Sequence, residues 1–388
     1  MDKSHVLISK GMDPYLITRE ALSHYPLSDL KDKRVLIKPN AARVALPGQG
    51  LTTHPLVVSA LVDHLKEQKV REIIIGESCI FGVDAREAFE KTGLRKVAEE
   101  KKVTLLDLDR LDPMELDIPR GILLKKIKVS SILKKVNFII SVPVMKTHMH
   151  TRLTLSLKNM KGLLWRREKA KLHHLSPNQE LHQNYKTLDI AISEMAWVLK
   201  PHLSVIDGTV GMEGMGPAYG KPKPMGLVIV GEDALSADSI ASRLMGFRPS
   251  CIPHLKLAYL KGLGEIRLKR INVEPKNYLK WAKPFEPPPA TLSIAFPDVV
   301  VYDKGACSAC LSTLLIFLQK YYRELDEYRL NDHKIHIGVG KYVDSCPKGT
   351  ILIGNCTSNL KDRGIFIGGC PPISSQIMKI LFPSPSYD

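Results

Sequence analysis

The sequence predicts an α/β protein with a mixed or mostly parallel sheet covered by helices, and a smaller C-terminal α/β unit rich in cysteine. Three observations lead to this prediction. Short apolar runs alternate with segments of helical periodicity over about the first 280 residues. A proline-rich segment at 283–289 interrupts this alternation. Five of the seven cysteines lie beyond that segment.

The first part of the chain alternates between expected strands and helices. An apolar run at 34–38 ends in Pro39 and Asn40, and Pro55 opens a segment with apolar residues at helical spacing. The other expected strands are 72–76, 103–106, 138–142, 203–206 and 227–230. The other expected helices are 85–91, 188–199, 234–245 and 255–261. Nearly continuous apolar strands between helices are typical of a sheet covered on both faces.

The segment at 283–289 reads as a linker, because its prolines cannot continue a helix. After it we expect strands at 299–301, 335–339, 351–353 and 365–367, with helices at 311–318 and 374–381. The predicted domains are therefore 1–290, an α/β domain, and 291–388, a cysteine-rich metal-cluster domain.

Composition limits the class of protein. The formal net charge is +16 and the pI about 9.4, which invites an anionic ligand, an acidic partner protein or a nucleic acid. Nucleic acid is not expected, because aromatic residues make up only 6% and no motif of a nucleic-acid-binding fold is visible. The sequence has neither an apolar run of about eighteen residues nor an apolar signal core. We expect a cytoplasmic protein without a membrane span, and the sequence leaves its oligomeric state open.

The late cysteines indicate a metal site. Cys307 and Cys310 form a short chelating loop, and Cys346, Cys356 and Cys370 follow singly. An odd number of cysteines suits thiolate ligands in a reducing compartment better than a set of disulfides. Cys356 and Cys370 follow short apolar runs and a glycine, so the predicted ligands are Cys307, Cys310, Cys356 and Cys370, with Cys346 as the alternative.

The spacing favours an iron–sulfur cluster over zinc. Structural zinc sites usually combine two short chelating loops, and this chain has one. The Gly369-Cys370-Pro371-Pro372 turn is similar to the last cluster-ligand turn of the small cluster-bearing subunit of respiratory complex I. We predict a [4Fe–4S] cluster, with zinc as the alternative.

A second group of candidate residues is basic. Between Lys146 and His174 the chain has eight Lys or Arg, four His and one acidic residue. The segment begins where an apolar strand ends, so Lys146 and His148 are candidates for catalysis on an anionic group. Ligand-binding candidates lie at other strand ends and in the basic segment: Lys38, Asn40, Thr53, His54, Lys158, Asn159 and Lys161. Thr52 is expected as a helix cap.

Asp207 through Pro217 reads as a glycine-rich loop after a strand. It matches neither nucleotide-binding fingerprint, since the glycine spacing differs and no Lys-Ser/Thr follows. Asp207 and Glu213 are its candidate catalytic carboxylates, and a turn without chemistry is the equal alternative.

Together these segments resemble a known family. The carrying segments are Val35–Asn40, Thr52–Pro55, Lys146–His148, Leu157–Gly162 and Asp207–Gly214. They look like the domain of unknown function 362 (DUF362) family, over about residues 34 to 265. The resemblance implies a bacterial or archaeal protein of a kind often described as iron–sulfur-cluster-binding. Many members carry a ferredoxin-like cysteine run, which this sequence replaces by a different arrangement in its C-terminal unit.

Two classes of function follow from the residues. The first is an iron–sulfur oxidoreductase acting on a phosphate- or carboxylate-bearing ligand held by the Lys/His cluster. The alternative is a non-enzymatic electron-transfer or cluster-assembly protein that docks an acidic redox partner, or a zinc-stabilised protein.

Overall fold

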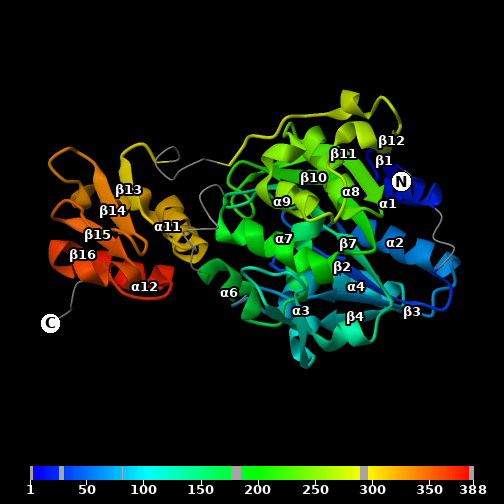
Figure 1. Cartoon of the computed structure of the whole chain (residues 1–388), viewed down its shortest axis with the longest axis horizontal. Helices are drawn as coiled ribbons and strands as arrows, with labels where there is room; N and C mark the ends of the chain where they lie inside the picture. Colours follow the sequence, from blue (N-terminus) through cyan, green and yellow to red (C-terminus); the bar gives the residue numbers. More distant parts are fainter. Residues whose placement is uncertain (1–2, 26–29, 81, 176–184, 289–295, 384–388) are drawn as a thin grey trace. The chain divides into compact units, whose positions relative to one another are not determined.

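The computed structural model describes residues 3–25, 30–80, 82–175, 185–288 and 296–383 (Figure 1). The chain forms two compact units. The first comprises residues 1–169 and 184–288, and the second comprises 170–183 and 289–388. Of the described residues, 170–175 thus group with the later part of the chain, whereas the sequence assigned them to the first domain.

The first unit is built on a mixed sheet. Ten strands belong to this sheet within the described residues, and eight of them follow the order β12-β1-β11-β10-β7-β2-β3-β4, with β8 beside β10 and β9 beside β8. Their bounds are β1 (Ser4–Lys10), β2 (Arg34–Pro39), β3 (Glu72–Glu77), β4 (Thr104–Asp107), β7 (Phe138–Val142), β8 (Val144–His148), β9 (Arg152–Leu153), β10 (Leu203–Glu213), β11 (Lys221–Gly231) and β12 (Ile271–Glu274). A separate hairpin joins β5 (Pro113–Asp117) to β6 (Lys126–Ser130).

The centre of this sheet is parallel. Strand β2 runs parallel to both β3 and β7, and β10 runs parallel to β7. Strand β11 is antiparallel to β1 and to β10. The predicted fold class, a mixed and mostly parallel α/β sheet, is confirmed.

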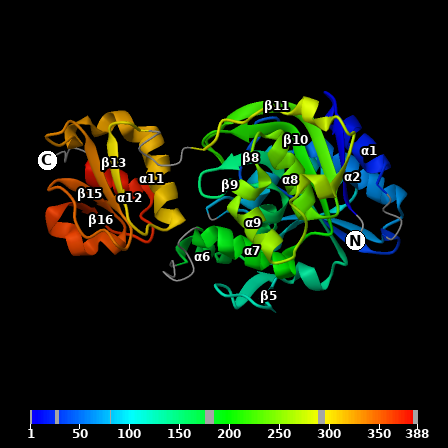
Figure 2. The same ribbon diagram turned by 45° about the horizontal axis from the view of Figure 1, so that its top comes forward.

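Helices cover both faces of the sheet (Figures 1 and 2). Their bounds are α1 (Pro14–Ser23), α2 (Pro55–Glu67), α3 (Ala85–Lys91), α4 (Leu94–Glu100), α5 (Leu155–Asn159), α7 (Thr187–Leu199), α8 (Ala234–Leu244) and α9 (Pro253–Leu260). Helix α6 (Glu168–His174) begins in the first unit and ends in the second. Helices α1 to α4 share a hydrophobic core with Val35 and Ile37 of β2. Because side chains alternate along a strand, Leu36 and Lys38 point to the other face, where Lys38 meets Asn159 of α5.

Helix α2 begins where the proline predicts. Pro55 stands at its first position, and the ring nitrogen Nδ1 of His54 accepts a hydrogen bond from the backbone N–H of Leu56. The expectation that Thr52 caps a helix is wrong, because His54 takes that role. The Thr52 hydroxyl is buried and has no hydrogen-bond partner among the described residues.

The glycine-rich segment after Asp207 is a strand as far as Glu213, and residues 214–217 form the bend and turn that remain of the loop suggested by the sequence. Strand β10 continues to Glu213 with an irregularity between Gly208 and Val210, and it pairs with β11 along this length. Glycine permits this because β8 packs closely against β10. A Cβ on Gly211 would lie 2.6 Å from the carbonyl oxygen of Met145.

The second unit contains a small parallel sheet. Its four strands, counted within 296–383, are β13 (Val299–Asp303), β14 (Ile335–Val339), β15 (Thr350–Ile353) and β16 (Gly364–Ile367), in that spatial order. Helix α11 (Ser308–Tyr321) connects β13 to β14, and α12 (Ser374–Leu381) follows β16. The linker predicted at 283–289 has no regular structure through residue 288, and its last residue lies outside the described residues.

None of the helices in the described part of the chain has both the length and the hydropathy needed to cross a bilayer.

Candidate functional site

The strand order of the first unit places a topological switch point at β2. After β2, strands β3 and β4 are added on one side of it, and β7 is then added on its other side. In open α/β sheets, ligands bind in the crevice outside the carboxyl ends of strands at such a point. The residues that follow β2, β3 and β7 are therefore the first candidates for a ligand site.

A buried ion pair joins the ends of β2 and β3. The Lys38 ammonium lies 2.7 Å from Glu77 Oε2, and the side chains are 2% and 0% exposed. Lys38 also donates to the Pro39 carbonyl and to Asn159 Oδ1, which uses all three of its N–H groups. Glu77 accepts from the backbone N–H groups of Ala41 and Ser78. Burial lowers the pKa of Lys38, and the charge of Glu77 opposes this shift. The ion pair holds the two strand ends together. The three hydrogen bonds of the Lys38 ammonium leave it no N–H for a ligand.

Two asparagines continue this network to Lys146. Asn159 donates to the backbone of Lys38, and its Oδ1 accepts from Asn40 at 3.3 Å. Asn40 Oδ1 in turn accepts from the Lys146 ammonium at 2.6 Å, and Lys146 also donates to the carbonyl of Leu51. One N–H of Lys146 remains. Burial lowers the pKa of Lys146 well below its usual value.

Arg43 and Lys158 lie close enough to Lys146 that their positive charges lower its pKa further. Both are half-buried. Neither side chain makes a hydrogen bond or an ion pair with any residue that the structure describes. Burial lowers the pKa of Lys158 to about 8, with Asp189 opposing and Arg43 and Lys38 adding to the effect. We call Arg43, Lys146 and Lys158 the cationic cluster. Three basic groups with unused donors at a switch point are suited to an anion.

Lys161 is also basic and half-buried. Burial, with Lys158 and Lys169, lowers its pKa well below the usual value. It interacts with a neighbouring group, so its donors are not all free.

Thr53, His54 and Asp207 form a second set of contacts beside the cluster. The Thr53 hydroxyl accepts from the Asn40 N–H and donates to the Val142 carbonyl. Asp207 is buried and accepts from the His54 backbone N–H at 2.7 Å, and from the backbone and hydroxyl of Thr209. Burial raises the pKa of Asp207, and these hydrogen bonds oppose the shift. The geometry gives Thr53 and Asp207 the role of holding the loop that ends at His54.

His148 and Glu213 are engaged elsewhere. Nδ1 of the buried His148 accepts from the His150 backbone N–H at 3.1 Å. Glu213 lies at the end of β10, where it pairs with Lys223 at 2.6 Å and accepts from the backbone N–H of Glu286. Burial alone would raise the pKa of Glu213, but the hydrogen bonds from Lys223 and from the Glu286 backbone lower it below its usual value. The structure therefore brings Lys38, Asn40, Lys146 and Asn159 into one network, but not Glu213.

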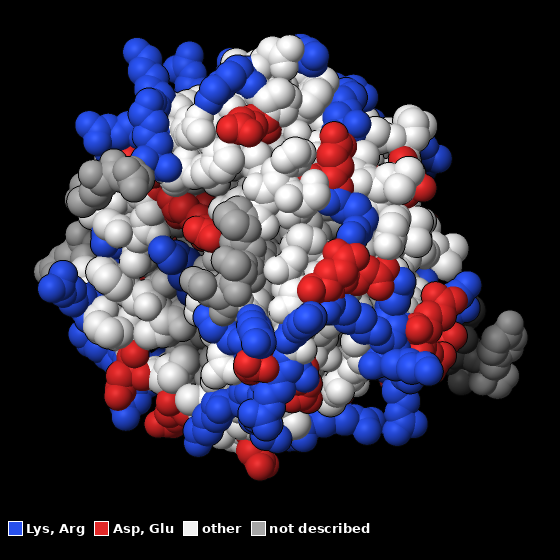
Figure 3. All heavy atoms as spheres, turned by 90° about the vertical axis from the view of Figure 1, so that its right-hand side faces the viewer, with Lys and Arg blue, Asp and Glu red and all other residues white. Residues whose placement is uncertain are grey.

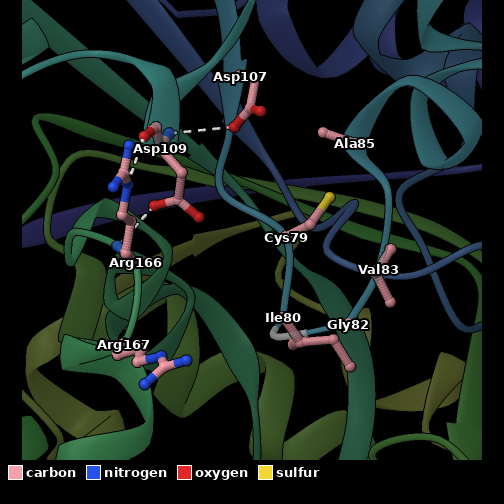
Figure 4. Close-up of a pocket in the computed structure, with 9 residues that line it drawn as sticks. All are labelled: Cys79, Ile80, Gly82, Val83, Ala85, Asp107, Asp109, Arg166 and Arg167. Atoms are coloured by element: carbon pink, nitrogen blue, oxygen red, sulfur yellow. Dashed lines mark hydrogen bonds between the residues drawn. The ribbon is translucent and has the colours of Figure 1, made fainter.

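A cavity of about 300 Å³ lies at the ends of β3 and β4 (Figure 4). Its lining residues are Cys79, Ile80, Gly82, Val83, Ala85, Asp107, Asp109, Arg166 and Arg167. It borders the loop that carries Arg43, because Ile80 and Cys79 hydrogen-bond to the backbone of Ala42 and Ala41. Asp109 accepts from the Arg166 backbone at 2.6 Å and from Lys169 at 3.0 Å.

Sequence reasoning missed Arg43, Asp107 and Asp109. Arg43 stands in a loop without a motif, three residues after Asn40. Asp107 ends strand β4, so the strand-end rule applied to every strand would have found it.

The positive charge of the first unit is not gathered in one uniform patch on the face that Figure 3 draws. Lys and Arg collect along its lower part, but Asp and Glu lie among them. A single-sign stripe typical of nucleic-acid binding is not seen on the described part of this face.

In the second unit, four cysteines follow the carboxyl ends of parallel strands. Cys307 and Cys310 come after β13, Cys356 after β15 and Cys370 after β16. Hydrogen bonds between Asn355 and Gly369 tie the last two strand ends together. Because parallel strands end at one edge of a sheet, cysteines scattered along the sequence come together there.

The four sulfurs influence one another. The Cys310 thiol donates to the Cys307 sulfur, which with the N–H groups of Ala309 and Cys310 at the start of α11 lowers the pKa of Cys307 to about 5. The Cys307 hydrogen bond and burial raise the pKa of Cys310, and the charges of Cys370 and Cys356 add to this.

Gly354 lies in contact with this group of sulfurs. A Cβ on Gly354 would lie 3.2 Å from Cys310 Sγ and 3.6 Å from the Gly369 carbonyl. Within the same unit, His174 Nδ1 lies 3.9 Å from Cys370 Sγ. The group thus brings four sulfurs together and is partly open to solvent, since Cys356 and Cys370 are exposed.

Cys346 is placed differently. It is 6% exposed and packs in a hydrophobic cluster with Val343, Leu352 and Leu360. No three His, Cys, Asp or Glu side chains in the described ranges stand at the separations that a single bound metal ion requires.

Comparisons with known proteins include one curated relative, one solved structure and one family. A thylakoid-associated protein of Synechocystis sp. is 26% identical over 230 residues, which is 59% of this chain and 68% of that protein. The solved structure of the lactate racemase apoprotein from Thermoanaerobacterium thermosaccharolyticum aligns with a TM-score of 0.41 at 11% identity, covering 92% of this chain and 70% of that chain. The family described as Domain of unknown function (DUF362) matches residues 35–243, which is more than half of the 388 residues. This chain belongs to the DUF362 family.

Proposed function

We propose that the protein is an iron–sulfur oxidoreductase, with a [4Fe–4S] cluster on Cys307, Cys310, Cys356 and Cys370 and an anionic ligand at the cationic cluster. The gathering of these four cysteines at one edge of the small sheet is the observation that carries the proposal. Thiolates on glycine-flanked turns suit a bulky inorganic cluster, and the family is often associated with iron–sulfur centres. When bound, the cluster would supply one-electron transfer.

The anion site rests on unused donors at a switch point. Arg43 and Lys158 are without partners in the described residues, and Lys146 retains one N–H. A carboxylate or phosphate group would replace the water around these half-buried charges. In this proposal the protein acts in the cytoplasm.

A second candidate is a non-enzymatic electron-transfer or cluster-assembly protein that docks an acidic partner. The exposure of Cys356 and Cys370 favours it, because a cluster near the surface can exchange electrons with another protein.

The first test is the iron and acid-labile sulfide content of anaerobically purified protein, with its visible spectrum before and after dithionite. About four iron and four sulfide per chain and a band that bleaches are expected. One zinc without sulfide would replace the proposal with a zinc-stabilised protein.

A second measurement separates enzyme from carrier. Sulfate, which mimics a bound anionic group, is titrated into the reduced protein while the electron paramagnetic resonance signal is recorded. A changed signal supports a ligand that communicates with the cluster. An unchanged signal despite bound sulfate supports the carrier.

A further inference from the structure

Lys158 differs from the other lysines of its surroundings. All three N–H groups of the Lys38 ammonium donate hydrogen bonds, two of those of Lys146 do so, and Lys161 has an interaction partner. Of these four, Lys158 alone has a side chain without a hydrogen bond or ion pair within the described ranges. It lies on α5, half-buried, one residue before Asn159, which is fixed by the buried network. Its amine therefore lies near Arg43 and Lys146 without making a contact that the fold requires.

Its protonation suits a nucleophile. With a pKa of about 8, about one tenth of the Lys158 side chains are neutral amines at pH 7, far more than for an ordinary lysine. A lysine that is desolvated or placed beside other cations is the kind that attacks carbonyl groups. Arg43 and Lys38 supply those neighbouring cations.

A buried carboxylate stands near the same amine. Asp189 of α7 is 1% exposed, and its charge raises the pKa of Lys158. Its Oδ1 accepts no hydrogen bond from the residues that the structure describes, although His254 Nδ1 lies 3.5 Å away. An incompletely satisfied carboxylate beside an amine can take up a proton that the amine releases.

We propose that Lys158 is an imine-forming nucleophile, and that its substrate is a small carbonyl compound with a carboxylate or phosphate group bound by Arg43 and Lys146. This rests on the anion site of the proposed function. The Lys158 nitrogen attacks the carbonyl carbon, a C–N bond forms, and the carbonyl oxygen leaves as water with the two protons of the amine. The product is a C=N bond whose positive charge, once protonated, draws electrons from the neighbouring carbon.

The test is trapping with borohydride. The anaerobically purified full chain is incubated with pyruvate at neutral pH and sodium borohydride, whose hydride reduces the imine to a stable secondary amine. Intact mass and peptide mapping locate the adduct. Acetone, a neutral carbonyl compound, is the matched probe without an anionic group, and glyceraldehyde 3-phosphate is the probe with a phosphate.

We expect one adduct at Lys158 with pyruvate or glyceraldehyde 3-phosphate and far less with acetone. Lys158→Arg keeps the charge and loses the adduct. Lys96→Arg, at an exposed lysine of α4, keeps it. No adduct with either anionic probe, or labelling that Lys158→Arg leaves unchanged, overturns the proposal. Sulfate binding measured on the same preparation separates this failure from failure of the anion site itself.

Discussion

Gly162 lies directly against Lys38. A Cβ on Gly162 would stand 2.4 Å from the Lys38 Nζ and 2.5 Å from Glu77 Oε1. The last residue of the Leu157–Gly162 segment is therefore glycine because the buried ion pair occupies the space of a side chain. The segment thus supplies Asn159 to the hydrogen-bond network of Lys38, and its Gly162 packs against the Lys38–Glu77 ion pair.

Replacing Gly162 by alanine should push the ion pair apart. We expect Gly162→Ala to lower the free energy of unfolding of the first unit by about 1–3 kcal/mol, as overpacking of an interior does. Tryptophan fluorescence during urea unfolding reports on this unit, because Trp165, Trp197 and Trp281 all lie in it. Gly231→Ala is the milder comparison, since its Cβ would meet the Val6 side chain at 3.3 Å, a tight contact but one that a small shift relieves. Equal stability of both variants would contradict the tight contact.

The Lys38–Glu77 pair should be costly to break from one side. Lys38→Met leaves Glu77 buried without its cation, and we expect a loss of roughly 3–5 kcal/mol in the free energy of unfolding. Lys38→Met combined with Glu77→Leu should recover much of this loss, because no uncompensated charge remains. The double-mutant cycle measures the coupling. If the single variant unfolds like the unmodified protein, the pair does not support the fold.

The strand-end rule explains how much of this site the sequence predicts. Lys38, Asn40 and Lys146 were found because each stands at or just after an apolar run, and the carboxyl ends of parallel strands meet. The rule does not tell which hydrogen-bond donors are already used within the protein. Lys38 was therefore predicted as a ligand contact, although its three N–H groups all bond to other protein atoms. Arg43 was missed because only the folded loop brings it near Lys146.

The same limits apply to the fold. The apolar run at Phe138–Val142 and the helix at Ser374–Leu381 were predicted with their observed bounds. The glycines after Asp207 suggested a loop, yet close packing of β8 makes glycine necessary inside a strand. Local propensity disfavours glycine in strands, and only the neighbouring strand reveals why it is present.

Sulfate affinity should depend on pH through Lys158. Burial lowers its pKa to about 8; the charge of Asp189 opposes this shift, and the charges of Arg43 and Lys38 add to it. Sulfate keeps its charge over this range, and it binds the protonated amine. Affinity should therefore fall as pH rises through about 8, by at most about tenfold per pH unit for this one group. Isothermal titration calorimetry measures it.

Lys158→Arg supplies the control for that titration, because guanidinium stays charged. Its affinity should be flatter over the same pH range. An identical pH profile in both proteins would assign the dependence to another group of the cluster, with Lys146 the next to test.

Cysteine substitutions should separate ligands from packing. Cys356→Ala and Cys370→Ala each remove a thiolate from the group at the sheet edge, so we expect loss of iron, of sulfide and of the visible band. Cys346→Ala should retain all three, because Cys346 packs against Val343 and Leu352 in the apolar cluster. The anaerobic iron-to-protein ratio measures the difference. Iron loss in Cys346→Ala with retention in Cys356→Ala would exchange the roles of these two cysteines, since a thiolate ligand is needed wherever its removal empties the site.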